Sequence, residues 1–369
     1  MRFDGFVDNW TIATLGDVCS YRKERRTLEK KYYVSTENIL QNYQGIERFD
    51  SIDKISGEAF DKNDVLMGNI RPYLKKVCFA DFDGVCNADV LVFKSKVLNP
   101  KYLHCVLAND SFINYVMSSV KGSKMPRGDK NYIMQYPLSY PSELEQAKIS
   151  NFIEILTKRI AVQNKIISKY ETLIKGISNH LLCKIEDCPT IKLSDILIEY
   201  NDKARQNNEY PILSSTMNGI FVQSEYFNKQ AASEETVGYK KVPYGYCTYR
   251  SMSDTGEFRF NIQKIVEIGI VSPAYPVFTS VEYDMRFIAF YLNNSARLRK
   301  QILEIKEGGT RFALPFSKLR SLTIPKITRL QQTKIVDVYC LFSRKKELEQ
   351  RFLLKLKEQK DYLLSKMFI

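Results

Sequence analysis

The chain has almost no histidine and no closely paired cysteines. Its two histidines are His104 and His180, and its eight cysteines include no Cys-x-x-Cys pair. Zinc modules need such ligands at short spacings, and histidine is the usual general base of enzymes. We therefore expect no zinc module, no disulfides and no histidine-based catalysis. The grouping of His180, Cys183 and Cys188 lacks a zinc-module spacing and is interpreted as a helix end.

Motifs for nucleotides and cofactors are also missing. No two glycines stand one residue apart, there is no Pro-Pro pair, and no phosphate-binding loop is present. These absences argue against a base-methylating enzyme and against nucleotide hydrolysis. Asp284 with Glu304-Ile305-Lys306 has the spacing of a metal-dependent nuclease, but the Glu and Lys fall in an amphipathic helix. Ser253 to Gly256 is interpreted as a turn before a strand at Phe258–Phe260. We predict a non-enzymatic protein.

Long apolar runs are absent as well. No stretch reaches the roughly 18 to 20 apolar residues of a membrane span, and the first ten residues lack the apolar core of a signal peptide. We expect a cytoplasmic protein without a membrane segment.

Positive charge and aromatic residues are plentiful. The 55 Lys and Arg outnumber 42 acidic residues, giving a net charge of +13 and a pI near 9.1. The chain also holds 23 Tyr and 21 Phe spread along its length. This combination favours a nucleic-acid partner over a membrane surface. A soluble protein that is merely basic is the alternative.

An internal repeat organises the sequence. Pro141 through Gln146 to Lys148-Ile149 resembles Pro325 through Gln332 to Lys334-Ile335, and the two glutamines are 186 residues apart. Leu15-Gly-Asp17-Val18 matches Leu193-Ser-Asp195-Ile196. Such a repeat predicts two similar units whose loops differ.

Between these anchors, loops that follow predicted strands also correspond. Gly68-Asn-Ile-Arg71 corresponds to Gly245 to Arg250 in the repeat, and Gly122-Ser-Lys124 corresponds to Gly309-Thr-Arg311. We predict several strands and one domain helix in each unit from β-branched content and helical periodicity. The strands are expected at 46–49, 65–67, 77–79, 90–93, 219–222, 265–271 and 276–279, and the helices at 100–119 and 285–306.

A long helix follows each proline-glutamine anchor. In the first, apolar residues recur at steps of three and four from Ile149 to Leu181, with Gln163 in one slot. In the second, the expected seam is Ile335, Val338, Phe342, Phe352, Leu356 and Leu363, but Lys345, Glu349 and Gln359 occupy other slots. Helices of matched length most simply pair as an antiparallel coiled coil. Packing inside a compact domain is the alternative.

The fold class is therefore predicted as α+β, with two similar α/β-mixed domains separated by a long antiparallel two-helix coiled coil. The internal repeat would give the molecule a pseudo-two-fold arrangement. The expected boundaries are 1–142 for the first recognition domain, 143–185 for the central helix, 186–324 for the second domain and 325–369 for the C-terminal helix.

Candidate DNA contacts cluster in the loops that the two halves share. Cations would engage phosphates, and a smaller set of planar donors would reach base edges. The candidates are Asn69, Arg71, Lys75, Lys76, Lys121, Ser123, Lys124, Arg127 and Lys130 in the first half, and Lys240, Lys241, Tyr249, Arg250, Ser251, Arg259, Thr310 and Arg311 in the second.

Together these features resemble the specificity subunit of type I restriction-modification enzymes. The resemblance rests on Trp10 with the Leu15-Gly-Asp17-Val18 opening, the Gly68-Asn-Ile-Arg71-Pro72 and Tyr249-Arg-Ser-Met-Ser-Asp254 loops, and the two anchors with their long helices. The second anchor departs from the family pattern with Leu330-Gln331-Gln332. The resemblance covers the whole chain.

The resemblance implies a DNA-binding subunit without catalysis, whose two target-recognition domains each bind half of a bipartite DNA sequence. The helices would set the half-site spacing and dock two methyltransferase subunits, and a restriction and translocase subunit would join the complex. S-adenosylmethionine, ATP and Mg would then belong to the partners. A related two-part (type IIB-like) system, a coiled-coil interaction protein that binds no specific DNA, and an enzyme with an unrecognised site are the alternatives.

Overall fold

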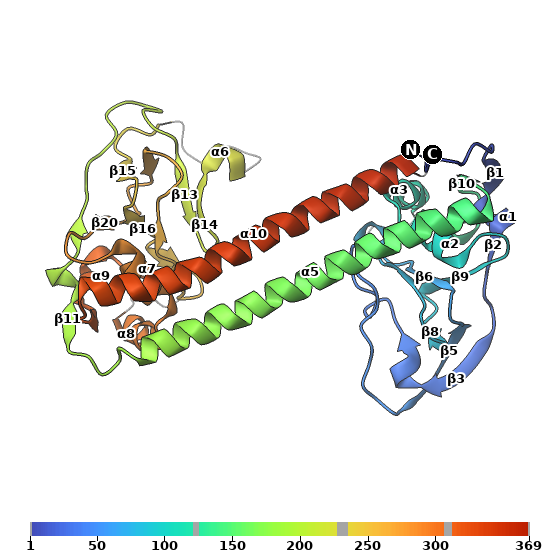
Figure 1. The fold of residues 1–369 in the computed structure, drawn as a ribbon, viewed down its shortest axis with the longest axis horizontal. Helices are drawn as coiled ribbons and strands as arrows, with labels where there is room; N and C mark the ends of the chain where they lie inside the picture. The colour runs from blue at the N-terminus through green and yellow to red at the C-terminus, as the bar shows by residue number, and fades with distance from the viewer. Residues whose placement is uncertain (1, 121–124, 227–234, 306–311, 368–369) are drawn as a thin grey trace. The chain divides into compact units, whose positions relative to one another are not determined.

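The computed structural model describes residues 2–120, 125–226, 235–305 and 312–367. The chain divides into two compact units (Figure 1). Unit 1 comprises Met1–Lys165 and Gln350–Ile369, and unit 2 comprises Ile166–Glu349. Each unit therefore contains one part of each of the two long helices.

Unit 1 is built on two four-stranded sheets. One has the strand order β2-β9-β6-β7, the other the order β3-β5-β8-β4, and β1 pairs with β10. The strands are β1 (Thr11–Thr14), β2 (Cys19–Tyr21), β3 (Arg25–Glu29), β4 (Tyr33–Val34), β5 (Lys54–Phe60), β6 (Val65–Gly68), β7 (Val77–Phe79), β8 (Gly84–Cys86), β9 (Val90–Ser95) and β10 (Pro137–Tyr140). The shorter helices are α1 (Leu15–Val18), η1 (Lys30–Tyr32), η2 (Pro72–Leu74), α2 (Pro100–Leu107), α3 (Asp110–Ser118) and α4 (Lys130–Ile133).

The apolar runs in β6 and β9 explain why the first sheet is buried on both faces. Successive side chains of a strand point to opposite faces. Val65 and Met67 of β6 join the core beneath α2, whereas Leu66 joins a second core with residues of β5 and β8. Figure 1 shows α2 beside β6 and β9.

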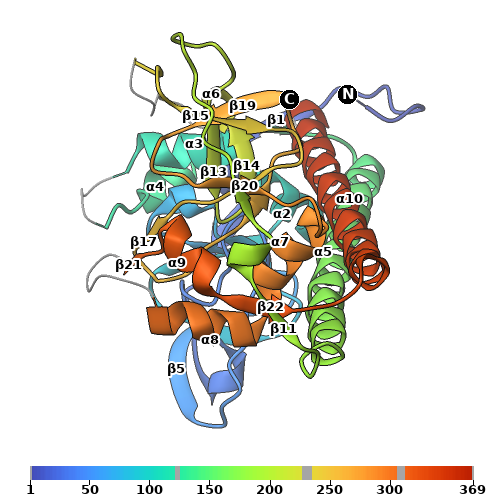
Figure 2. The ribbon, with the colours of Figure 1, turned by 90° about the vertical axis from the view of Figure 1, so that its left-hand side faces the viewer.

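Unit 2 repeats the central sheet of unit 1. Its four-stranded sheet has the order β12-β20-β16-β18, and four two-stranded pairs surround it: β11-β22, β13-β14, β15-β19 and β17-β21. The strands are β11 (Thr190–Lys192), β12 (Ile198–Glu199), β13 (Leu213–Thr216), β14 (Gly219–Val222), β15 (Lys240–Pro243), β16 (Cys247–Thr248), β17 (Met252–Ser253), β18 (Asn261–Ile262), β19 (Ile268–Val271), β20 (Val277–Thr279), β21 (Phe312–Ala313) and β22 (Thr323–Pro325). The shorter helices are η3 (Leu193–Asp195), α6 (Gln223–Tyr226), α7 (Met285–Asn294), α8 (Ala296–Ile305) and α9 (Phe316–Ser321). Figure 2 shows α8 beside β22, where the Gln301 side chain bonds Thr323.

The repeated glutamine makes the same pair of hydrogen bonds in both units. In unit 1, the Gln146 Oε1 accepts from the backbone N–H of Asn99 at 2.9 Å, and its Nε2 donates to the carbonyl of Pro141 at 2.8 Å. In unit 2, the Gln332 Oε1 accepts from the N–H of Asp284 at 2.8 Å, and its Nε2 donates to the carbonyl of Ile327 at 3.1 Å. Both amides thus join a long helix to the residue that caps a domain helix.

The second repeated anchor also has matching geometry. The buried Leu15 donates its N–H to the carbonyl of Tyr136, and the buried Leu193 donates to that of Leu322. Each leucine follows a strand that pairs with the strand just before a long helix, β1 with β10 and β11 with β22. The sequence repeat therefore corresponds to a structural repeat within each unit.

The two long helices are α5 (Glu143–Cys183) and α10 (Arg329–Met367). In unit 1, Ile149, Ile153 and Leu156 of α5 pack in one core with Leu363, Leu364 and Met367 of α10. In unit 2, Leu182 of α5 and Val336 of α10 share another core. Within the predicted seam of α5, Ile149, Leu156, Gln163 and Ile167 are buried, whereas the other positions are only partly buried: Phe152, Ile160, Tyr170, Ile174, Ile177 and Leu181.

The predicted seam of α10 was wrong in part. Val338 is 41% exposed and Phe352 is 39% exposed, whereas Val336 and Leu356 are buried. The buried row near the start of α10 passes through Val336 instead of Val338, and partly buried Ser343 and Lys346 continue it. Because polar residues lie on the buried face, the spacing of apolar residues did not predict this row.

Several predicted elements are confirmed and others are corrected. Five of the expected strands match β6, β7, β9, β14 and β20, and 265–271 contains the shorter β19. Residues 47–49 form no strand, and Ile46 makes only an isolated bridge with Ile39. The expected strand at 258–260 is also wrong, because the backbone of Phe260 bonds the side chain of Asn293 instead of a strand. The two expected domain helices are each divided, at Asn109 and at Ser295.

Replacing Gln146 with alanine is expected to destabilise the protein by about 1–3 kcal/mol, because the N–H of Asn99 and the carbonyl of Pro141 lose buried partners. Chemical denaturation of the full chain measures the change. The matched control Gln359→Ala alters an exposed helical glutamine and should have little effect. Equal losses for both variants would contradict the assigned role.

Candidate nucleic-acid interface

Two loops of unit 1 that carry predicted contact residues are joined by hydrogen bonds. The Asn69 side chain donates from Nδ2 to the carbonyl of Gly128 at 3.2 Å and accepts the N–H of the same residue at 3.1 Å. The backbone N–H of Arg71 donates to the carbonyl of Pro126 at 2.8 Å. The loop after β6 and the segment before α4 therefore form one continuous surface.

Unit 2 joins the equivalent segments in the same way. The Tyr249 hydroxyl donates to the carbonyl of Leu314 at 2.9 Å, and the N–H of Leu314 donates to the carbonyl of Ser251 at 2.8 Å. Strands β17 and β21 extend this contact. In both units the chain leaving the central sheet is bonded to the chain that leads into the last short helix.

Asn69 and Tyr249 have a different role from the one predicted. Asn69 is 5% exposed and Tyr249 is fully buried, with their polar groups bonded to backbone as described. Burial raises the pKa of the Tyr249 hydroxyl, and nearby Cys247 adds to the effect. In this structure both residues position loops and present no group to a ligand.

Four predicted cations already have partners inside their unit. Lys75 Nζ lies 2.7 Å from Asp110 Oδ2, Arg127 Nε lies 2.9 Å from Asp89 Oδ1, and Lys241 Nζ lies 3.2 Å from Asp202 Oδ2. Lys76 Nζ donates to the carbonyl of Thr36 at 2.5 Å. The three carboxylates offset positive charge of these loops, whereas the carbonyl of Thr36 only holds the Lys76 ammonium group in place.

Five other predicted cations have no ion-pair partner within the part of the chain that the structure describes. Arg71, Lys130 and Arg250 are exposed, and Lys240 and Arg259 are partly exposed. Arg71 has φ +52°, and Lys75, at the other end of the short helix η2, has φ +54°. Non-glycine residues in this left-handed region cost about 1–3 kcal/mol and concentrate at functional sites. These cations are the strongest candidates for phosphate contacts.

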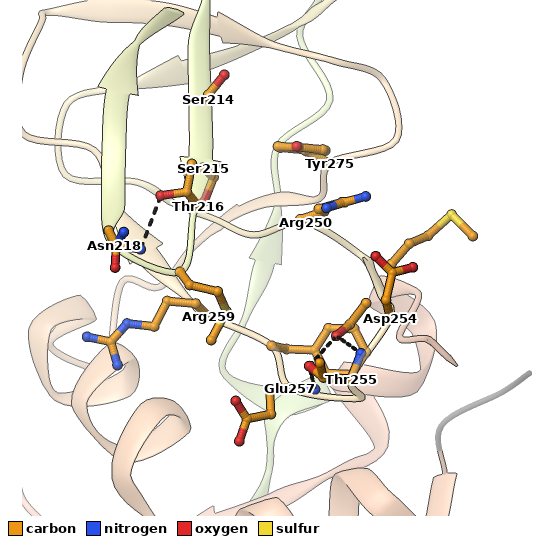
Figure 3. A pocket seen from close by; sticks show the side chains of 14 residues that line it. Ser214, Ser215, Thr216, Asn218, Arg250, Asp254, Thr255, Glu257, Arg259 and Tyr275 are labelled. Carbon is orange, nitrogen blue, oxygen red and sulfur yellow. Dashed lines mark hydrogen bonds between the residues drawn. The ribbon is translucent and has the colours of Figure 1, made fainter. Parts of the chain in front are cut away.

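Unit 2 also has an open groove beside its predicted contact loops. It has a volume of about 470 Å³ and contains Arg250 and Arg259 in its lining. Figure 3 shows Asn218 at the turn of the β13–β14 hairpin and Thr255 and Glu257 on the loop opposite. The groove thus combines two cations with amide, hydroxyl and carboxylate groups, which can form hydrogen bonds with base edges.

The hairpin part of this groove was missed by sequence reasoning. Asn218 of the hairpin and Tyr275 line the groove, and neither was among the predicted contacts. The Asn218-Gly219 dipeptide at the start of the apolar strand β14 is a turn signal that could have located the hairpin. Ser251, which was predicted, donates its hydroxyl to the carbonyl of Ala274 at 2.8 Å.

Five predicted contact residues lie outside the described residues. They are Lys121, Ser123, Lys124, Thr310 and Arg311.

The described residues offer no arrangement for metal chemistry. Among them, no group of three or more His, Cys, Asp or Glu could hold a metal ion. Asp284 caps α7 by accepting the N–H of Arg286, and its carboxylate lies 2.7 Å from the Arg286 guanidinium. Burial opposes ionisation of Asp284, but the bonds from Arg286 outweigh it and lower the pKa of the carboxyl. Asp284 is therefore a structural residue.

None of the described helices is both long enough and apolar enough to cross a bilayer.

Comparison with known proteins identifies the kind of domain. Residues 7–172 match the family model of the type I restriction modification DNA specificity domain. The EcoDI specificity subunit of a type I restriction enzyme from Escherichia coli is 24% identical over 125 residues, which is 34% of this chain. The aligned part spans only 28% of that relative.

Solved structures agree in fold. The S subunit of a type I restriction-modification system from M. genitalium has a TM-score of 0.63 at 15% identity, covering 100% of this chain and 97% of its own. A chain from a structure on complex assembly and conformational transition of the type I R-M system has a TM-score of 0.57 at 16% identity, covering 98% of each chain. The resemblance inferred from the sequence is confirmed, and the mixed α/β fold is shared with such subunits.

Replacing Tyr249 with phenylalanine is expected to lower the free energy of unfolding by about 1–2 kcal/mol, because the buried carbonyl of Leu314 loses its donor. Hydrogen exchange should also speed up at Leu314, whose own N–H bonds Ser251. Thermal unfolding and exchange mass spectrometry measure both effects. The exposed Tyr244→Phe is the control, and an effect of equal size there would refute the positioning role.

Proposed function

Because residues 7–172 match the family model of the type I restriction modification DNA specificity domain, we propose that this chain is the sequence-specific DNA-binding subunit of a type I restriction-modification system. Unit 2 repeats the central sheet and both anchors of unit 1. Each unit would bind one half of a bipartite DNA target.

The observation that carries this proposal is the repeated pair of joined loops. In each unit, loops that differ in sequence are bonded at the same place on the same four-stranded sheet. A constant support with different loops suits a protein that binds two different half-sites. Arg71, Lys130, Arg250 and Arg259, which have no ion-pair partner among the described residues, would contact phosphates, and donors such as Asn218 would contact base edges.

The long helices would separate the two recognition domains as an antiparallel coiled coil. A rigid pair of helices holds two domains at one distance and one rotational phase, and half-sites on the same DNA face recur near one turn, roughly 10 bp. Within each unit, the cores shared by α5 and α10 support this pairing.

Methyltransferase subunits would dock on the outward faces of these helices. Ile155 and Val162 of α5 are 63% and 55% exposed, and Leu341 and Leu348 of α10 are 55% and 54% exposed. Exposed apolar residues at heptad spacing are typical of helix-packing surfaces. The complete complex would add restriction and translocase subunits.

Catalysis and cofactors would belong to the partner subunits in this proposal. S-adenosylmethionine, ATP and Mg would bind there, in agreement with the missing glycine-rich and phosphate-binding motifs of this sequence. This chain would contribute target choice and assembly.

Methylation mapping of genomic DNA tests the proposal. Cells that lose this chain should lose methylation at one bipartite motif, and restoring the chain should restore it. The double variant Arg250→Ala/Arg259→Ala should reduce methylation at that motif, because it removes two unpaired cations. Arg48→Ala, which removes a cation paired with Asp81, is the control. An unchanged set of methylated motifs in an active system would refute the function.

Shortening both helices by one heptad tests the spacing role. Deleting 166–172 from α5 together with 340–346 from α10 removes about 10 Å of helix while preserving heptad phase. The preferred gap between half-sites in a randomised-target library should become shorter. An unchanged gap with retained DNA binding would disprove the role of the helices in spacing.

A further inference from the structure

Unit 1 contains a cavity that the DNA-binding proposal does not use. It has a volume of about 410 Å³ and lies where α2, the first half of α5 and the end of α10 meet. We call it the α2 cavity. Its apolar lining includes Phe79, Cys105, Ala108, Ile153 and Leu364.

The two units line this position with different side chains. When the two units are aligned on Asn99 and Asp284, Cys105 of α2 corresponds to Phe290 of α7. When the long helices are aligned on Gln146 and Gln332, Ile153 corresponds to Tyr339. In unit 2, the rings of Phe290 and Tyr339 pack with centroids 4.7 Å apart, and Phe290 is 2% exposed. Two aromatic rings thus take the place of Cys105 and Ile153 in unit 2, although Ile174, Ser178 and Asn293, which correspond to Lys360, Leu364 and Ala108, still line an open pocket of about 580 Å³ there.

A lysine without a carboxylate partner lines the α2 cavity. Lys360 forms no ion pair or hydrogen bond among the described residues, although the same cavity contains Glu154. Glu154 is already engaged by Lys101 and Lys158, each at 2.6 Å. By the same register, the residue of α5 that corresponds to Lys360 is Ile174. The positive charge of Lys360 is thus another difference between unit 1 and unit 2.

The cavity has an excess of positive charge. Its other lining carboxylate, Asp81, is paired with Arg48 at 3.0 Å. Burial lowers the pKa of His104 to about 4, so this imidazole is neutral at pH 7 and adds no charge. Burial also lowers the pKa of Lys360, because nearby Cys105 and Asp361 offset only part of the cost of burying its ammonium group. An anion would remove that cost.

We propose that the α2 cavity binds a small monocarboxylate with an apolar body, its carboxylate on Lys360 and its body against Phe79, Cys105 and Ile153. The apolar walls favour this ligand over a free phosphate, whose oxygens need several donors. An apolar cavity of about 150 Å³ holds benzene, so a cavity of this size accommodates a two-ring carboxylate. The site is independent of the DNA-binding loops and of the function proposed above.

Calorimetric titration of the full chain with 1-naphthoate at pH 7 tests the site. The unmodified protein should bind one equivalent saturably. Lys360→Ile, which introduces the residue found at the repeat position, should weaken binding by about tenfold or more, because a charge-assisted hydrogen bond is lost. The neutral 1-naphthamide should bind the unmodified protein about as weakly as naphthoate binds Lys360→Ile.

Two further variants complete the test. Cys105→Phe/Ile153→Tyr copies the filling of unit 2 and should abolish binding. Lys357→Ile, which removes an exposed lysine of the same helix, should leave binding unchanged. The proposal is overturned if the unmodified protein does not bind naphthoate saturably, if Lys360→Ile binds as tightly as the unmodified protein, or if inorganic phosphate competes with naphthoate. Should the double variant fail to fold, the comparison of Lys360→Ile with Lys357→Ile decides the outcome.

Discussion

A buried glutamine amide joins each long helix to the domain from which that helix emerges. Gln146 and Gln332 are 3% and 1% exposed, and each bonds one N–H at the start of a domain helix and one carbonyl five residues before itself. A primary amide offers a donor and an acceptor on one short side chain, so it satisfies both backbone groups at once. The starting orientation of each long helix relative to its sheet depends on this amide.

The sequence predicted the parts of the fold that repeat. Glutamine followed by Lys-Ile is recognisable because both units need the same amide at the same place, and the leucines of the opening motif are retained because both are fully buried. The heptad pattern of α5 was readable because apolar residues recur along it at steps of three and four, even though Gln163 and Ser178 are also buried. The buried row of α10 was not, since Ser343 and Lys346 lie on it.

The candidate site was predicted less well, for a reason of geometry. Residue type selected candidate loops, but it did not distinguish a polar side chain that faces solvent from one that faces the backbone of another loop. Asn69 and Tyr249 are of the second kind, and their partners lie 59 and 65 residues away in the chain. Likewise, an isolated sequence does not show that Lys75, Arg127 and Lys241 already have acidic partners.

Asn69 and Tyr249 also show how two units can diverge without losing a common support. An amide in one and a phenol in the other bond the backbone of equivalent segments, although the two side chains share neither size nor shape. What persists between the halves is the position of the acceptor carbonyl, while the donor is free to change with its surroundings. Alignment by residue type is therefore blind to such pairs, and homology between distant copies is better traced through the backbone groups that side chains satisfy.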